Sequence, residues 1–179
     1  MKTHVSLPWN KTDIAAAKLY DYVKTHTDIL QQQHVVNVVT NIDDVMQHVP
    51  ELVEFFAEHK VTPKFGVVFY AKPDKTFPPH IDFGKMKRFL FPVFNCQGTR
   101  TEFYRVSSND TVLITLENGR QYYDVKITPP YDVLDCFELN QPVVLDTSLP
   151  HGVSRDCSTD LSRISVAVAT VESLDHFLQ

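Results

Sequence analysis

The chain has 179 residues, of which 43% are hydrophobic and 22% charged, a size and composition typical of one globular domain and not of a disordered or fibrous protein. The formal net charge of −5 gives no reason to expect a nucleic-acid partner, and no apolar run reaches the roughly 18 residues that a membrane span needs. Three cysteines without a CxxC pair favour a reducing, cytoplasmic location over a disulfide-stabilised secreted fold.

The first third of the chain, residues 1–62, is expected to be a mainly helical support region. Asn10 or Thr12 could cap a helix, because the apolar residues that follow recur at helical spacing. These apolar residues are Ala15, Leu19, Tyr22 and Val23. The β-branched segment 34–40 predicts a strand. Two short helices should follow it, the second beginning at Pro50, since proline favours the first turn of a helix.

From residue 63 onward, helical spacing gives way to short apolar runs separated by turns. The expected strands are 65–71, 89–95, 100–106, 111–117, 120–127, 142–146 and 163–170. Asn118-Gly119 is the clearest hairpin signal, because this dipeptide tolerates the positive φ angles of a type I′ turn. Residues 171–178 should end the chain as a short helix. Helices followed by strands predict one mainly β domain over residues 1–179, with a helical layer on an antiparallel sandwich or barrel.

His80 and Asp82 form the first candidate site. In an extended segment, residues two apart point to the same face, so an imidazole and a carboxylate would stand side by side. His151, which follows the apolar run 142–146, could supply the third ligand of the two-histidine, one-carboxylate set that non-haem iron uses. Iron is favoured over zinc because this set leaves positions open for a reaction at the metal. The alternative is an ordinary surface ion pair between His80 and Asp82.

Arg163 opens an apolar strand, where a buried guanidinium would need an anionic partner. Its planar fork suits a carboxylate, and Ser165, two residues further on the same face, could add a hydroxyl donor. The alternative is an exposed arginine paired with Asp156 or Asp160.

The HxD pair, the β-rich stretch after it, the later histidine and the Arg-x-Ser segment stand in an order that resembles the Fe(II)/2-oxoglutarate-dependent oxygenase superfamily. The sequence is similar to the aspartyl/asparaginyl β-hydroxylase-like and prolyl-hydroxylase-like branches, and to small oxygenase-like proteins of marine bacteria and phages. The resemblance covers residues 63–170 and implies a double-stranded β-helix barrel of the jelly-roll, cupin-like kind.

The resemblance also implies roles for individual residues. The ligands of Fe(II) would be His80, Asp82 and His151. The distal carboxylate of the cosubstrate 2-oxoglutarate would be bound by Arg163 and Ser165.

Tyr104, Asn95 and Arg88 are weaker candidates for the cosubstrate pocket. Arg88 is included because an arginine soon after the first metal histidine contacts the cosubstrate in the aspartyl/asparaginyl branch. That branch often lacks the acidic ligand, whereas Asp82 is present in this chain. The sequence therefore resembles the general group of oxygenases with two histidine ligands and one carboxylate ligand more than it resembles that branch. The substrate of that branch is accordingly not implied for this chain.

Three functions remain open from the sequence. The first is a non-haem Fe(II)/2-oxoglutarate-dependent dioxygenase that uses O2 to hydroxylate a small-molecule or peptide substrate. The second is a cupin-type metalloprotein, an isomerase or a dioxygenase, that does not use 2-oxoglutarate. The third is a non-catalytic β-sandwich binding protein without a metal ion. Arg163 separates the first from the second, because only the first requires a carboxylate anchor there, and metal content separates both from the third.

Overall fold

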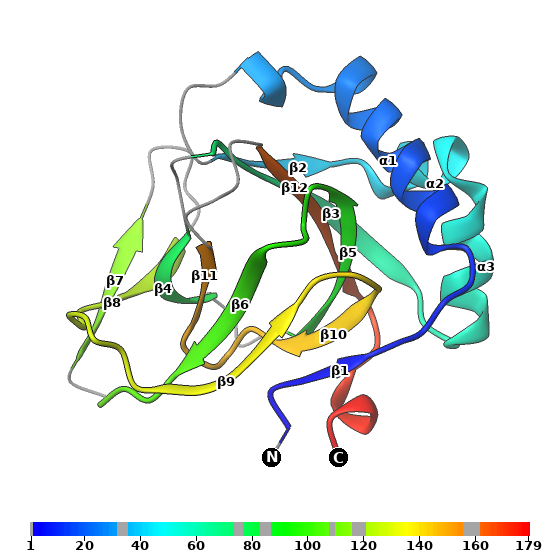
Figure 1. The fold of residues 1–179 in the computed structure, drawn as a ribbon. Helices are drawn as coiled ribbons and strands as arrows, with labels where there is room; N and C mark the ends of the chain where they lie inside the picture. The colour runs from blue at the N-terminus through cyan, green and yellow to red at the C-terminus, as the bar shows by residue number, and fades with distance from the viewer. Residues whose placement is uncertain are drawn as a thin grey trace.

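The chain forms two six-stranded antiparallel β-sheets with helices on one side, as Figure 1 shows for the computed structural model. It describes residues 2–31, 36–73, 77–82, 87–107, 110–115, 121–155 and 162–179. No helix among these residues is long and apolar enough to cross a membrane. The helices are α1 (Thr12–His26), α2 (Ile42–His48) and α3 (Pro50–Glu58), with 3-10 turns η1 (Ile29–Gln31) and η3 (Asp175–Phe177).

The first sheet, in spatial order, contains β1 (His4–Ser6), β10 (Val143–Asp146), β5 (Lys87–Phe94), β12 (Arg163–Thr170), β3 (Pro63–Ala71) and β2 (Val36–Thr40). The second sheet contains β7 (Thr111–Thr115), β8 (Gln121–Val125), β4 (Phe77–Asp82), β11 (His151–Arg155), β6 (Thr99–Tyr104) and β9 (Val133–Glu138). From β3 to β6, and again from β9 to β12, each strand belongs to the sheet opposite that of the strand before it. This alternation is consistent with a jelly roll.

Where a barrel was expected, the described strands form two facing sheets. Among the described strands, no hydrogen-bonded ladder joins one sheet to the other. Side chains of both sheets nevertheless share one apolar cluster, so the sheets pack face to face. The members of this cluster include Leu90 and Ala167 from the first sheet and Phe103 and Phe137 from the second.

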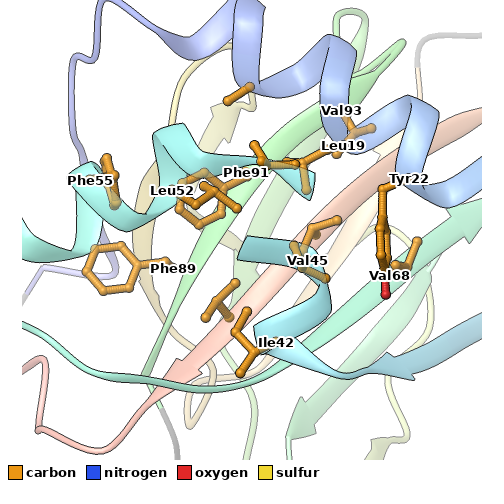
Figure 2. Packing of buried hydrophobic residues seen from close by; sticks show 14 of the residues in the cluster. Leu19, Tyr22, Ile42, Val45, Leu52, Phe55, Val68, Phe89, Phe91 and Val93 are labelled. Atoms are coloured by element: carbon orange, nitrogen blue, oxygen red, sulfur yellow. The ribbon is translucent and has the colours of Figure 1, made fainter. Parts of the chain in front are cut away.

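The helices cover the outer face of the first sheet (Figure 1). The apolar face predicted for α1 is buried there, and α3 adds Leu52, Phe55 and Phe56. Figure 2 shows these side chains meeting the outward-facing residues of β5, among them Phe89 and Phe91. The first sheet is therefore buried on both faces, between the helices and the second sheet.

Burial on both faces explains the sequence of β12. Ile164, Val166 and Val168 face the helical layer, as their alternation predicts. Arg163 and Ser165 lie on the other face, towards the second sheet, where they line a cavity. The strand therefore places two polar residues inside the molecule without interrupting the apolar face that supports the helices.

Most of the expected elements are present, with shifted ends. The strands β1, β9 and β11 were not expected, and β4 was expected only as an extended segment at His80 and Asp82. The C-terminal segment forms the 3-10 turn η3 in place of the short helix expected over 171–178. The Asn118-Gly119 turn lies outside the described residues, although β7 and β8 pair as the hairpin signal predicts.

Candidate metal centre

Strand β4 carries the HxD pair, and a bulge sets its orientation. His80 lies opposite His151 of β11, whereas Phe77 lies opposite Val153, so β4 uses one residue more than β11 over this stretch. The irregularity falls at the diproline Pro78-Pro79, where the missing N–H groups make a regular ladder impossible. As a result, Phe77 and His80 line the same cavity although they are three residues apart.

His151 comes to this pair as the first residue of β11, which lies beside β4 in Figure 1. Residues directly opposite in an antiparallel pair point to the same face. The ring centroids of His80 and His151 are accordingly 4.4 Å apart. The possible ligand atoms of His80, Asp82 and His151 all lie within 4.8 Å of one another, an arrangement that could hold a metal ion.

Backbone carbonyls determine which nitrogen each histidine offers. Nδ1 of His80 is 2.8 Å from the carbonyl oxygen of Pro78, and Nδ1 of His151 is 2.8 Å from that of Leu149. A carbonyl can only accept, so Nδ1 carries the proton and donates it in both rings. Each neutral ring then keeps its lone pair on Nε2, ready for a metal ion.

Burial keeps His151 neutral. Its side chain is withdrawn from water, and this desolvation, together with the nearby His80, lowers the pKa of His151 to about 4. Metal ions bind the neutral imidazole, so a histidine that resists protonation is suited to be a ligand.

The two oxygens of Asp82 face different neighbours. Oδ1 is 3.8 Å from Nε2 of His80, and Oδ2 is 3.4 Å from Nη2 of Arg88. Thr147 holds the residue from the backbone side, since the Asp82 N–H donates to the Thr147 carbonyl at 3.0 Å. Burial alone would raise the pKa of Asp82, but the charge of Arg88, the two histidines and a hydrogen bond from the Thr147 side chain bring it below its ordinary value. The carboxylate is therefore ionised and able to bind a cation.

A cavity between the two sheets adjoins these three residues. Its volume is about 50 Å³, which is room for on the order of four water molecules. Its apolar wall is formed by Phe69, Phe77, Leu90, Leu145, Val153 and Ala167. Arg88, Arg163 and Ser165 supply polar groups, so the cavity combines an apolar lining with two buried cations.

Arg163 is 2% exposed, which rules out the exposed arginine considered above. Its Nη1 donates to Oγ of Ser165 at 3.2 Å, while its Nε has no hydrogen-bond partner among the described residues. Asp156 and Asp160, the alternative partners, lie outside those residues. Because an unpaired buried donor is costly, this N–H is suited to an anion that enters the cavity.

The structure places only one of the three weaker candidates for the cosubstrate pocket at the cavity. Arg88 lines the cavity, but Asn95 and Tyr104 do not. Asn95 adopts a positive φ of 49° just after β5, beside the N-terminal end of α1. Tyr104 donates to Glu102 at 3.0 Å and packs against Tyr131. Its hydroxyl is thus engaged away from the histidines.

Sequence reasoning missed Thr147 as a neighbour of Asp82. Its only signal is its position between the apolar run 142–146 and His151, which the pairing of β4 with β11 brings to the end of β4.

The donor set fits a divalent ion. Two imidazole nitrogens and one ionised carboxylate are ligands of iron, zinc and similar metals. Two ligand atoms about 2.1 Å from one ion and at right angles to it are about 3.0 Å apart. The observed spacing of 3.8 Å between His80 and Asp82 exceeds this by less than about 1 Å, which small side-chain rotations remove.

No protein-family model and no curated protein matches the chain. Two solved structures have a similar fold. The epimerase SnoN in complex with Fe3+, alpha ketoglutarate and nogalamycin RO is 14% identical, with a TM-score of 0.52 over 94% of this chain and 78% of SnoN. The non-heme alpha ketoglutarate dependent epimerase SnoN from nogalamycin biosynthesis is 14% identical, with a TM-score of 0.50. This second match covers 96% of the present chain and 78% of the SnoN chain. At this level of identity, the likeness shows that the chain shares the fold of SnoN.

Proposed function

We propose that the chain is an Fe(II)- and 2-oxoglutarate-dependent oxygenase that hydroxylates a small-molecule or peptide substrate, built on a double-stranded β-helix. One observation carries the proposal: the set of His80, Asp82 and His151 adjoins a cavity that also contains a buried arginine with an unused N–H. The first feature suits a metal ion and the second suits a carboxylate, and 2-oxoglutarate needs both.

Iron held by two histidines and one carboxylate supplies open coordination positions for oxidative chemistry with O2, in which 2-oxoglutarate gives succinate and CO2 and one oxygen atom enters a C–H bond of the substrate. The residues of the chain bind, orient and shield. His80 and His151 present Nε2, because their Nδ1 protons are donated to carbonyls. Apolar side chains, including Phe69 and Leu145, limit the access of water.

The cosubstrate carboxylate is assigned to Arg163 and Ser165. Both lie on the cavity face of β12, and both are almost fully buried. Arg88 is the less suitable anchor, because its guanidinium is already close to Asp82. A charge-assisted pair with a buried arginine is strong and directional, so it would fix the orientation of a small dicarboxylate.

The fold shared with SnoN supports this proposal without fixing the reaction. SnoN is described with Fe3+ and alpha ketoglutarate, and it is an epimerase. Hydroxylation by this chain therefore rests on its own site, and its substrate is selected by surface loops, which vary freely on one fold.

Binding of 2-oxoglutarate to the Mn(II)-loaded protein, measured by calorimetry, tests the proposal. We expect binding that requires the metal and is much stronger than that of succinate, which lacks the keto oxygen needed to chelate. Metal binding without any affinity for 2-oxoglutarate would favour the cupin-type alternative. If the chain binds no divalent metal, the remaining alternative is a non-catalytic β-sandwich binding protein.

A further inference from the structure

We propose that Arg88 is a positioning residue of the metal centre, which holds Oδ2 of Asp82 so that the carboxylate binds a metal ion through Oδ1 alone. The inference rests on the proposed metal site and adds a role for a side chain that need not touch the metal or the cosubstrate.

The location of Arg88 suits this role. It lies on the cavity face of β5, two residues before Leu90, and is 6% exposed. Its guanidinium lies over the Phe65 ring, 5.7 Å from the centroid. The backbone of Arg88 is fixed as well, since β5 pairs with β10 and residue 88 lies opposite Leu145. The guanidinium is therefore held in place before any ligand binds.

The two ends of the Asp82 carboxylate then have separate tasks. Oδ2 is 3.4 Å from Nη2 of Arg88, and Oδ1 is the oxygen 3.8 Å from Nε2 of His80. Guanidinium groups bind carboxylate oxygens strongly when both are buried. Rotation of Asp82 to place both oxygens on a metal ion would break this pair and leave a buried guanidinium without its anion.

Thr147 limits the movement of Asp82 from another side. It accepts the Asp82 N–H through its carbonyl at 3.0 Å, and its side chain hydrogen-bonds the carboxylate. Thr147 is itself 3% exposed. Arg88 and Thr147 together hold Asp82 by its backbone and its carboxylate, which leaves little freedom for a second mode of binding.

Charge gives the arrangement a second consequence. A divalent ion bound by two neutral histidines and Asp82 has a net charge of one, and the pairing of Asp82 with Arg88 restores the local charge to two. A more positive centre attracts an anionic ligand more strongly, especially in a cavity with little water. One-oxygen binding also leaves a coordination position that a two-oxygen carboxylate would occupy.

Crystal structures with Co(II) and no organic ligand test the proposal directly. In the wild-type protein, we expect one oxygen of Asp82 about 2.1 Å from the ion, and the other beyond bonding distance and beside Arg88. In Arg88→Met, which keeps the bulk and removes the charge, Asp82 should rotate and bind through both oxygens. Arg88→Lys should restore one-oxygen binding, since an ammonium can still pair with Oδ2.

Arg163→Met is the matched control, because it removes a buried arginine from the same cavity that forms no ion pair with Asp82 among the described residues. It should leave the coordination of Asp82 unchanged. Titration of the Co(II) forms with oxalate supplies a solution measurement, and Arg88→Met should lose roughly tenfold or more in affinity.

The outcomes separate the two proposals. If Co(II) binds and Asp82 uses both oxygens in the wild-type protein, Arg88 has no positioning role, whatever happens to its variants. Unchanged one-oxygen binding in Arg88→Met would also overturn the inference, and a loss of oxalate affinity alone would then identify Arg88 as a direct anion contact. In each of these cases the proposed metal site survives. Absence of Co(II) binding would remove both proposals.

Discussion

Backbone carbonyls and buried arginines prepare the side chains of this site before any metal ion binds. The carbonyls of Pro78 and Leu149 set the tautomers of the two histidines, and burial keeps His151 neutral. His151 therefore has almost no proton to release at neutral pH, and both rings already present Nε2, which favours affinity.

Exchange of Arg163 separates cosubstrate binding from metal binding. Arg163→Ala should leave Fe(II) affinity nearly unchanged and weaken 2-oxoglutarate binding roughly 30-fold or more, because loss of one partner of a buried charged pair costs about 2–5 kcal/mol. Arg163→Lys should recover part of the loss, since an ammonium cannot form two parallel bonds. Calorimetry with each ligand measures both effects.

His151→Ala is the reciprocal variant and should abolish metal binding first. If Arg88→Ala removes cosubstrate binding while Arg163→Ala does not, the anchor has been assigned to the wrong arginine.

At the residue scale, the sequence was informative where a rule of local geometry applies. His80 and Asp82 share a face because residues two apart in a strand do so, and Arg163 and Ser165 follow the same rule. The same rule places Tyr104 beside Glu102 on β6, on the opposite face to Phe103, which pairs with His151. Nothing local shows that Asn95 lies beyond the end of β5, because the pattern of apolar residues does not determine where a strand ends.

At the scale of elements, the contact between β4 and β11 places the strictest requirement on residue size in the site. Gly152 follows His151, and a Cβ atom there would lie 2.8 Å from the carbonyl oxygen of Phe77 and 3.3 Å from backbone atoms of Pro78 and Pro79. Backbone atoms cannot move aside as a side chain can. The close approach of these strands, which brings the two histidines together, therefore requires glycine at this position.

Gly152→Ala should push β11 away from β4. We expect a loss of about 1–3 kcal/mol in the free energy of unfolding, as for other overpacked sites, and roughly tenfold or more in Co(II) affinity. Gly66→Ala is the control, since its Cβ would meet the Thr40 hydroxyl at 2.6 Å and residue 66 does not line the cavity. It should cost stability alone. Equal Co(II) affinity in both variants would show that the strand contact does not position the ligands.

The stability of the folded state should depend on pH through His59, at the end of helix α3. This residue follows the helix and packs against Phe55, with ring centroids 4.5 Å apart, and against Phe177. Burial lowers the pKa of His59 below its unfolded value of about 6.5. The unfolded chain then binds more protons below that pH, so the folded state loses stability as pH falls through this range.

Urea unfolding at pH 7.5 and 5.5 measures this effect. His151 has the same sign, so the test is a comparison with His59→Leu and not the slope of the wild-type protein. The variant should lose less stability between the two pH values. An equal loss would mean that His59 titrates normally in the folded protein.

The elements missed from the sequence have a common cause. Strand β9 is an edge strand with Val133 and Leu134 exposed, so burial imposes no alternation on it. Strand β11 is five residues long and begins with His151 and Gly152, which have no strand preference. Both segments are strands because they form hydrogen bonds with neighbouring strands. Such pairing joins residues far apart in the sequence, so a local pattern of residues does not predict it.

For the molecule as a whole, two separate apolar clusters stabilise different parts of the fold. One joins the helices to the outer face of the first sheet, and the other lies between the sheets beside the cavity. The edges of the sheets are also linked, because His4 of β1 lies 3.3 Å from Asp135 of β9 and its ring stacks on Phe137. The helical layer can therefore be weakened without reaching the site directly.

Phe55→Ala tests this division. The side chain is fully buried between α3 and the sheet (Figure 2), so its loss should lower the free energy of unfolding by about 3–5 kcal/mol. Co(II) affinity of the folded protein should stay the same, because the metal ligands lie beyond the first sheet. Val53→Ala, on the exposed side of the same helix, should change stability by less than about 0.5 kcal/mol. Weaker metal binding by Phe55→Ala would show that the two clusters are coupled.

The order of helices before strands predicted a helical layer on antiparallel sheets, and this is the arrangement observed. The crossing of the chain between sheets was beyond local patterns, since it depends on which distant strands pair.

Anaerobic titration of the Fe(II)-loaded protein with 2-oxoglutarate tests the central claim most directly. If His80, Asp82 and His151 hold iron beside a carboxylate anchor, the titration should produce a weak visible absorption band that saturates at one cosubstrate per chain. The band should be absent in His151→Ala and should require higher cosubstrate concentrations in Arg163→Ala. A wild-type protein that binds Fe(II) but develops no band at saturating 2-oxoglutarate would contradict the claim.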